Sequence, residues 1–181
     1  MARDGKRRII NGALELLRAE GGGSITLDAT ARQVGLTKPG LMYHFPTKEA
    51  LMLAVVDHVA AEWVRSMADR LGGSPAEASA SDRIRAYVET AFTGRLDRAD
   101  FAIFFDAVYR DALTEAWERR LRPWLDLPDD LPDSTRARLT AARLAADGYW
   151  IAVATGVFAP AERDHAPLTA VMDTLLKDEN H

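Results

Sequence analysis

Cysteine is missing from this chain of 181 residues. The protein therefore has no disulfide, no thiolate nucleophile and no zinc site with cysteine ligands, which fits a reducing cytoplasm. No uninterrupted apolar run approaches the ~18 residues that a membrane-spanning helix needs. The first residues lead into a charged segment and not into the apolar core of a signal peptide. We therefore expect a cytoplasmic protein that does not enter a membrane.

The motifs of common enzymes are also missing. The histidines lie far apart, without a His-x-x-x-His pair: they are His44, His58, His165 and His181. The chain has no Gly-x-Ser-x-Gly turn and no phosphate-binding glycine loop. Asp57 precedes His58 directly, so on a helix the two side chains point to different faces and form no catalytic dyad. We predict a protein that is not an enzyme, with no catalytic residue, no metal site and no cofactor.

The charge of the chain is unevenly distributed. Apolar residues make up 48% of the sequence, which is typical of a globular protein, and the formal net charge is −4. Residues 1–50 carry eight basic and five acidic side chains, a balance of +3, whereas the remainder carries fifteen and twenty-two, a balance of −7. A basic end on an acidic body is expected of a protein whose one end faces phosphate, although acidic bodies also serve solubility.

Residues 26–45 read as two short helices joined by a tight turn. Thr26 and Thr37 are good N-caps, because a threonine hydroxyl can accept a hydrogen bond from an amide in the first turn of a helix. Gly35 lies between them and can adopt the left-handed conformation that disfavours a residue with a Cβ. Ala31 and Leu41 supply a small residue where the helices cross and an apolar anchor on the second helix.

The residues after this pair favour a DNA-binding element. The spacing of the pair alone also fits an ordinary hairpin of two helices. However, Pro46 ends the second helix, Thr47 caps the next one, and Lys48 lies in its first turn. A cation there opposes the helix dipole, so a nearby phosphate would explain it. Near the N-terminus, residues 6–8 form a basic cluster that either contacts the DNA backbone or is solvated.

Residues 35–51 closely resemble the signature of the TetR family of bacterial transcription regulators, and the resemblance covers about residues 6–55. The most specific positions are Tyr43, Phe45, Lys48 and Leu51. Two features depart from the family pattern: residues 21–23 are all glycine, and Thr30 stands where the family usually has Ile or Val. The threonine removes apolar burial worth about 1 kcal/mol, which reduces the expected local stability.

Apolar periodicity predicts helices throughout the chain. The first has an apolar face of Ile10, Ala13, Leu14 and Leu17, and the long fourth has Leu51, Val55, Val59, Trp63 and Met67. Besides the two short helices, we expect helices over residues 6–20, 48–71, 84–92, 101–108, 113–124, 134–158 and 167–177. No segment alternates as a strand does. We predict an all-α chain of about nine helices, with a three-helix helix-turn-helix DNA-binding domain over residues 1–50 and a helical ligand-binding and dimerisation domain over residues 51–181.

The resemblance implies what the second domain does. In the TetR family the last two long helices pair with their copies in a dimeric four-helix bundle, which implies a homodimer through residues 134–158 and 167–177. The first of these segments is apolar around much of its circumference, which supports a partner, although burial within the chain gives the same pattern. Family members usually bind a small molecule between the helices that follow the DNA-binding element. The expected pocket residues are Trp63, Tyr87, Phe105, Tyr109, Tyr149 and Trp150, although an aromatic residue taken singly belongs more often to the core than to a ligand site.

The resemblance therefore implies a sequence-specific DNA-binding regulator, a ligand-responsive repressor that binds a palindromic operator as a dimer. The alternative is a constitutive regulator, or one controlled by a protein partner, without a small-molecule ligand. The expected DNA-binding residues are Thr26, Thr37, Lys38, Pro39, Gly40, Tyr43, His44 and Lys48. Of these, Lys38 and Gly40 should approach bases or phosphates, Pro39 a thymine methyl, and the last three phosphates. An alternative role for His44 is that of a charge partner at the end of its helix.

Overall fold

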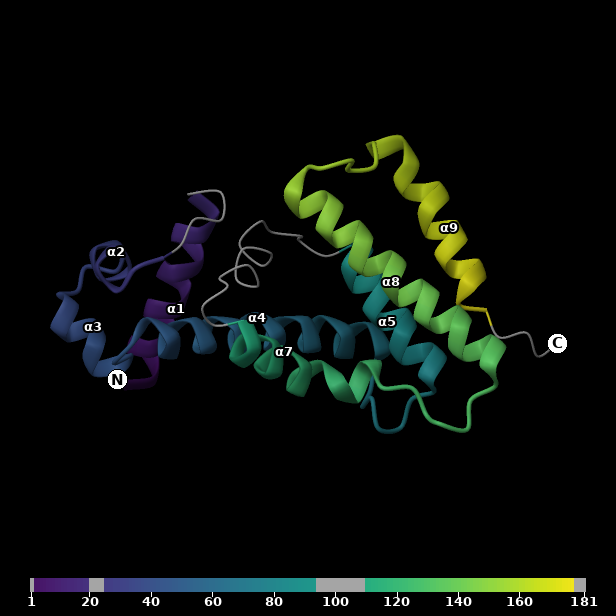
Figure 1. The fold of residues 1–181 in the computed structure, drawn as a ribbon, viewed down its shortest axis with the longest axis horizontal. Helices are drawn as coiled ribbons and strands as arrows, with labels where there is room; N and C mark the ends of the chain where they lie inside the picture. Colours follow the sequence, from purple (N-terminus) through teal and green to yellow (C-terminus); the bar gives the residue numbers. More distant parts are fainter. Residues whose placement is uncertain (1, 20–24, 94–109, 178–181) are drawn as a thin grey trace. The chain divides into compact units, whose positions relative to one another are not determined.

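The computed structural model of the protein describes residues 2–19, 25–93 and 110–177. Within these ranges it contains eight α-helices, one short 3-10 helix and no strand (Figure 1). The prediction of an all-α fold is therefore confirmed, and the expected number of about nine helices is close. The helix expected over residues 101–108 lies outside the described residues, as do the pocket residues Phe105 and Tyr109.

The chain divides into two compact units. The first comprises Met1–Ala61 and Asp97–Arg120, and the second comprises Glu62–Leu96 and Leu121–His181. The boundary expected at residue 50 lies within helix α4 (Lys48–Leu71), and the division after Ala61 lies within the same helix. The assignment of DNA binding and ligand binding to separate domains remains a prediction.

The first unit begins with three helices that contact one another: α1 (Ala2–Ala19), α2 (Leu27–Gln33) and α3 (Lys38–His44). The buried apolar side chains of α1 are Ile9, Ala13, Leu14 and Leu17. Ile10, which the periodicity placed on this face, is only half-buried. At its N-terminal end the buried face is thus shifted by one residue, from Ile10 to Ile9. The helix also begins earlier than expected, at Ala2.

Helix α4 has the predicted bounds, and its apolar face is buried as expected at Leu51, Val55, Val59, Trp63 and Met67. In the second unit α5 (Ala80–Thr93) packs against α8 (Asp133–Thr155), and α8 also packs against α9 (His165–Leu175). The apolar residues of α5 that are buried recur at helical spacing, and they are Ile84, Tyr87, Val88, Ala91 and Phe92. Helix α7 (Arg110–Leu125) is followed by residues 126–132, which include Pro128 and Pro132 and are not helical.

The ends of the last two helices were predicted incorrectly. Helix α8 does not reach Phe158; it ends at Thr155, because Gly156 adopts a φ of +73° and its N–H bonds to the carbonyl of Ala152 at 2.9 Å. Helix α9 begins at His165, after a 3-10 helix over Glu162–Asp164, so Pro167 is its third residue and not its first. The amides of the first turn need no partner within the helix, so the sequence cannot distinguish these positions for a proline.

Candidate functional site

Hydroxyl groups cap three successive helices of the first unit. The Oγ1 of Thr26 accepts a hydrogen bond from the amide of Ala29 at 3.1 Å, and the Oγ1 of Thr37 accepts one from Gly40 at 3.2 Å. Thr47 caps α4 in the same way, with the amide of Ala50 at 3.0 Å. All three predicted caps are therefore confirmed, and they determine where α2, α3 and α4 begin.

The turn between α2 and α3 depends on the predicted glycine. Gly35 has a φ of +65°, and its N–H bonds to the carbonyl of Arg32 at 3.1 Å. The N–H of Leu36 bonds to the carbonyl of Ala31 at 2.8 Å. These two bonds are the Schellman arrangement, in which a left-handed residue closes the end of a helix. Ala31 and Leu41 are both buried at the crossing of the two helices, as the sequence predicted.

Thr30 causes less disruption than its polarity suggested. Its side chain is fully buried, and its Oγ1 donates a hydrogen bond to the carbonyl of Thr26 at 2.9 Å. A buried hydroxyl with a partner avoids the desolvation cost of an unsatisfied polar group. The threonine therefore links the first turn of α2 to the cap of the same helix.

Most of α3 faces solvent. Its only buried residue is Leu41, whereas Tyr43 is 83% exposed and Lys38 and Pro39 are also exposed. The Nζ of Lys38 lies 2.9 Å from Oδ2 of Asp28, and both side chains are about half exposed, at 51% and 53%. Such a surface pair contributes little stability, so Lys38 can exchange Asp28 for another anion at little cost.

The other predicted DNA-binding residues lie in α3 and at the start of α4. Gly40 is half-buried, and a Cβ there would lie 3.2 Å from the capping oxygen of Thr37. His44 is half-buried, with its ring 5.3 Å from that of Tyr43 and against the backbone of Gly5 in α1. Lys48 is half-buried at the first position of α4. None of the eight predicted residues is buried, but their contact with DNA remains a prediction.

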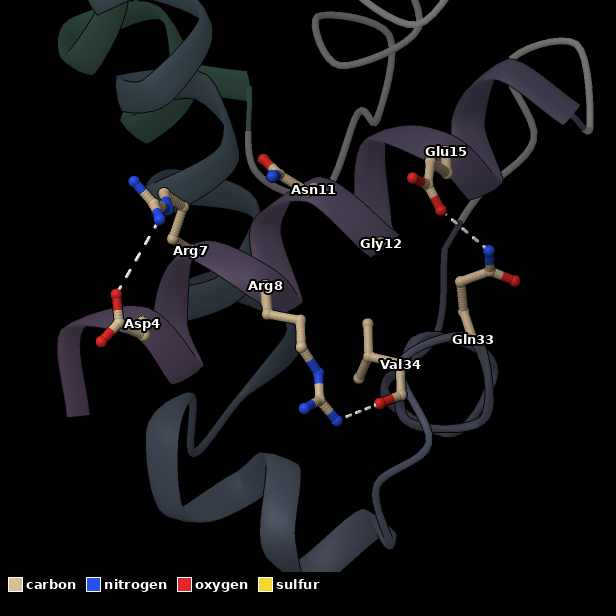
Figure 2. Close-up of a pocket in the computed structure, with 8 residues that line it drawn as sticks. All are labelled: Asp4, Arg7, Arg8, Asn11, Gly12, Glu15, Gln33 and Val34. Carbon is tan, nitrogen blue, oxygen red and sulfur yellow. Dashed lines mark hydrogen bonds and ion pairs between the residues drawn. The ribbon is translucent and has the colours of Figure 1, made fainter. Parts of the chain in front are cut away.

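A polar groove of about 480 Å³ lies between α1 and α2 (Figure 2). It is lined by Asp4, Arg7, Arg8, Asn11, Gly12, Glu15, Gln33 and Val34. Arg8 donates a hydrogen bond from Nη2 to the carbonyl of Val34, and Nε2 of Gln33 donates to Oε2 of Glu15 at 3.0 Å. Arg7 instead lies 3.9 Å from Asp4 on its own helix. The sequence did not distinguish these two neighbouring arginines.

The predicted pocket residues of the second unit form two groups. In the first, the ring of Trp63 lies 5.5 Å from that of Tyr87 and 6.1 Å from that of Trp150. The hydroxyl of Tyr87 donates to Oδ1 of Asp147 at 2.5 Å, and Arg143 donates to Oδ2 of the same carboxylate at 2.6 Å. Burial, and then the charge of Asp147, raise the pKa of Tyr87, so its hydroxyl stays protonated.

Tyr149 belongs to the second group. Its ring stacks on that of Phe92, with centroids 4.2 Å apart and planes at 9°, and burial raises its pKa. The Nε2 of His165 lies 2.9 Å from the carbonyl of Phe92, and because a carbonyl only accepts, Nε2 carries the hydrogen. Tyr149 and His165 line a cavity of about 510 Å³ with Pro160, Ala161, Glu162 and Ala166. Sequence reasoning missed His165, because 73 residues separate it from Phe92.

Residues 2–19, 25–93 and 110–177 contain no group of three or more His, Asp or Glu side chains placed to hold a metal ion. Over the same ranges, no helix is both long and apolar enough to span a membrane.

Two family models match the sequence. Residues 9–55 match the model for bacterial regulatory proteins of the tetR family, and residues 81–177 match that for the tetracyclin repressor-like C-terminal domain. No curated protein sequence matches this chain significantly.

Several solved structures share the fold. A protein from Pseudomonas aeruginosa PAO1 is 16% identical with a TM-score of 0.65, covering 97% of this chain and 92% of that chain. The multidrug binding protein EbrR, in complex with imidazole, is 20% identical with a TM-score of 0.65, covering 96% and 95%. A tetR-family regulator from Streptomyces coelicolor is 18% identical with a TM-score of 0.58, covering 94% and 81%. At these identities, the similarity shows the shared fold.

Proposed function

Because the chain belongs to the TetR family of bacterial transcription regulators, we propose that it is a ligand-responsive repressor that binds a palindromic operator as a dimer. The matched family consists of regulatory proteins and not of enzymes. The proposal extends this family assignment to particular residues, to an interface and to a mode of control.

The exposed face of α3 is the observation that carries the DNA-binding part of the proposal. A seven-residue helix is too short to be stable alone, and this one buries only Leu41. Its N-terminal residues Lys38, Pro39 and Gly40 would enter the major groove, as the first residues of a recognition helix do. Tyr43 is 83% exposed and would contact the phosphate backbone.

The remaining proposed contacts surround this face. Lys48 and the hydroxyls of Thr26 and Thr37 would contact phosphates, in addition to the capping roles of the two threonines. His44 would have two roles, because its ring already lies against Gly5. It would hold the end of α3 on α1 and present its outer edge to a phosphate.

Exposed apolar side chains support a homodimer through α8 and α9. Leu144 is 55% exposed and Ile151 is 44% exposed, and seven residues place them on the same face of α8. Gly148 lies between them on this face, with open space around it. Val171 on α9 is 53% exposed. A second copy covering these residues would bury the apolar surface and hold two α3 helices for two half-sites.

The aromatic residues of the second unit support a small-molecule effector of unknown identity. The cavity beside Tyr149 and His165 has about 510 Å³, a size that suits drug-sized ligands. The cluster of Trp63, Tyr87 and Trp150 is the second candidate region. In either place, a ligand would lower operator affinity only by binding more tightly to the conformation that does not fit DNA.

The experiment begins with selection of duplexes from a random library by the purified full-length protein. The selected duplex and a scrambled duplex are then titrated by fluorescence anisotropy at several salt concentrations. We expect an inverted repeat and a preference for it of at least about a thousandfold, because specific sites exceed non-specific ones by that factor or more. Equal binding to both duplexes at every salt concentration would exclude sequence-specific regulation.

Ligand control needs its own measurement. A thermal-shift screen with apolar and amphipathic compounds should find stabilising compounds, because a ligand of the folded state raises its stability by mass action. Those compounds should also release the selected duplex. If no compound does both, while specific DNA binding is intact, the regulator is constitutive or is controlled by a protein partner.

A further inference from the structure

Four residues of α1 form a row that faces α2 and α3. Gly5, Arg8, Gly12 and Glu15 are separated by three, four and three positions, so they lie along one face of the helix. This row, called here the α1 stripe, differs from the buried apolar face because it contains two glycines and two charged residues. Three of its members line the groove in Figure 2.

Arg8 supplies a bond that α2 cannot make for itself. The Schellman bonds at Gly35 use the carbonyls of Ala31 and Arg32, two of the groups that otherwise lack a partner at the end of α2. The carbonyl of Val34 accepts from Nη2 of Arg8 instead. A guanidinium at a helix C-terminus also interacts favourably with the helix dipole. Arg8 therefore connects α1 to the residue directly before the turn.

Gly12 allows the backbone of α1 to approach the same residue. A Cβ at Gly12 would lie 2.2 Å from Cγ1 of Val34, which is far inside a normal contact distance. The next nearest atoms would be Cγ of Gln33 at 3.5 Å and Cβ of Val34 at 3.7 Å, which are ordinary contacts. The obstacle is therefore one methyl group on a stiff, β-branched side chain.

The two end residues of the α1 stripe, Gly5 and Glu15, contact the C-terminal ends of α3 and α2, respectively. Oε2 of Glu15 accepts a bond from Gln33 at 3.0 Å, at the end of α2. At the other end, a Cβ at Gly5 would lie 2.8 Å from Cε1 of His44, the last residue of α3. The stripe thus contacts the end of α2, the turn and the end of α3.

We propose that the α1 stripe determines the position of α3, and that Arg8 and Gly12 are positioning residues for operator recognition. This inference rests on the proposed function. The groove suits this role better than phosphate binding, because Asp4 and Glu15 balance the charges of Arg7 and Arg8. In addition, the guanidinium of Arg8 already donates a hydrogen bond to the carbonyl of Val34, so it is engaged within the protein.

The first test uses Gly12→Ala, Val34→Ala and the double variant, in the full-length protein with the duplex selected by the wild type. Gly12→Ala should lower affinity for that duplex by about tenfold or more, because overpacking shifts the backbone. The double variant should recover most of the loss, since Val34→Ala removes the methyl group that a Cβ at Gly12 would meet. Helical circular dichroism confirms that each variant is folded.

The readout separates positioning from stability. A variant that is less stable but still folded would keep its affinity for both duplexes. A displaced α3 should instead lose affinity for the selected duplex and retain binding to the scrambled one. The role of Gly12 would be overturned if Gly12→Ala lost affinity for the selected and the scrambled duplex in parallel. It would also be overturned if adding Val34→Ala to Gly12→Ala did not restore the preference for the selected duplex.

Arg8→Met provides a second test, with Arg7→Met as the matched control. The first substitution removes the bond to Val34, and the second removes an equal charge from the neighbouring Arg7, which pairs with Asp4 of its own helix. Arg8→Met should lower the preference for the selected duplex about tenfold without changing the salt dependence of binding. A change in that dependence of about one unit would identify Arg8 as a phosphate contact and overturn its positioning role. An unchanged preference would also overturn it.

The controls separate failure of this inference from failure of the proposed function. If the wild type prefers no duplex, the proposed function fails before any variant is compared. If the wild type prefers its selected duplex and both Gly12→Ala and Arg8→Met keep that preference unchanged, only the inference about the α1 stripe fails.

Discussion

Gly35→Ala tests whether backbone conformation alone holds the turn before α3. Gly35 has a φ of +65°, and a Cβ built there meets no atom within 4 Å. Steric overlap therefore does not contribute, and the cost is that of placing alanine in the left-handed region, about 1–2 kcal/mol. Alanine also restricts the unfolded chain, which offsets about 0.4–1 kcal/mol of this cost. We expect a net loss of up to about 1.6 kcal/mol in the free energy of unfolding, with a central value of about 0.8 kcal/mol.

Two other glycines provide matched controls in the same chain. Gly72 has a φ of +70° and also has no atom within 4 Å of a Cβ, so Gly72→Ala should cost about as much stability as Gly35→Ala. Gly73 has the same open surroundings without a left-handed φ. Gly73→Ala should therefore be neutral, or should stabilise the protein by up to about 1 kcal/mol.

Urea unfolding and DNA titrations of all three variants test the reasoning. Gly35→Ala and Gly72→Ala should lower the free energy of unfolding by similar amounts. Only Gly35→Ala should weaken binding to the selected duplex, because Gly35 lies between α2 and α3 and Gly72 does not. If Gly73→Ala costs as much as Gly72→Ala, conformation is not the cause. If Gly35→Ala and Gly72→Ala affect DNA binding equally, the turn does not position α3.

Four further predictions concern other parts of the chain. Lys48→Ala should weaken binding to every duplex similarly and make the salt slope in an anisotropy titration shallower by about one unit. Ala31→Leu should abolish specific DNA binding while circular dichroism still shows a helical protein, because the added volume at a residue only 2% exposed separates α2 from α3. Phe158 belongs to residues 134–158, the first segment of the expected dimer interface, and it is 99% exposed with a φ of +51°. Phe158→Gly should therefore weaken the dimer in sedimentation equilibrium and leave the monomer as stable or more stable, because glycine adopts this φ without strain. Asp57 accepts bonds of 2.8 and 2.9 Å from Arg120, which lower the pKa of Asp57. The pair with Arg120 stabilises the folded protein fully at pH values above 3.8, the ordinary pKa of an aspartate, and this stabilisation is lost as the pH falls through the lowered pKa of Asp57. The decrease in melting temperature caused by Asp57→Asn should therefore be smaller at acidic pH than at neutral pH.

Local chemistry explains why much of the first unit could be predicted from the sequence. Each of the caps at Thr26, Thr37 and Thr47 acts within three residues of itself, and the glycine turn also depends on its immediate neighbours. The ends of α8 and α9 were less predictable, because several residues there can end or begin a helix. Gly156 competes with Pro160 as the stop, and nothing in the local sequence ranks them.

Contacts between distant residues explain what the sequence did not reveal. Gly5 and Gly12 read as weak positions in a helix, since glycine there is destabilising compared with alanine. The structure explains why both positions are glycine, because His44 lies against Gly5 and Val34 lies against Gly12. The division of the expected pocket residues has the same origin. Tyr149 and Trp150 are adjacent in the chain, yet one stacks on Phe92 and the other approaches Trp63.

The lengths of α2 and α3 connect these observations to function. Each has seven residues, fewer than an isolated helix needs to persist in water, so their positions must come from caps and from neighbouring helices. The caps determine where each helix starts, but a cap does not determine how α3 is oriented against the rest of its unit. That orientation depends on α1, through the buried Leu41 and through the α1 stripe. Substitutions in α1 that never contact DNA should therefore change which sequence the protein prefers.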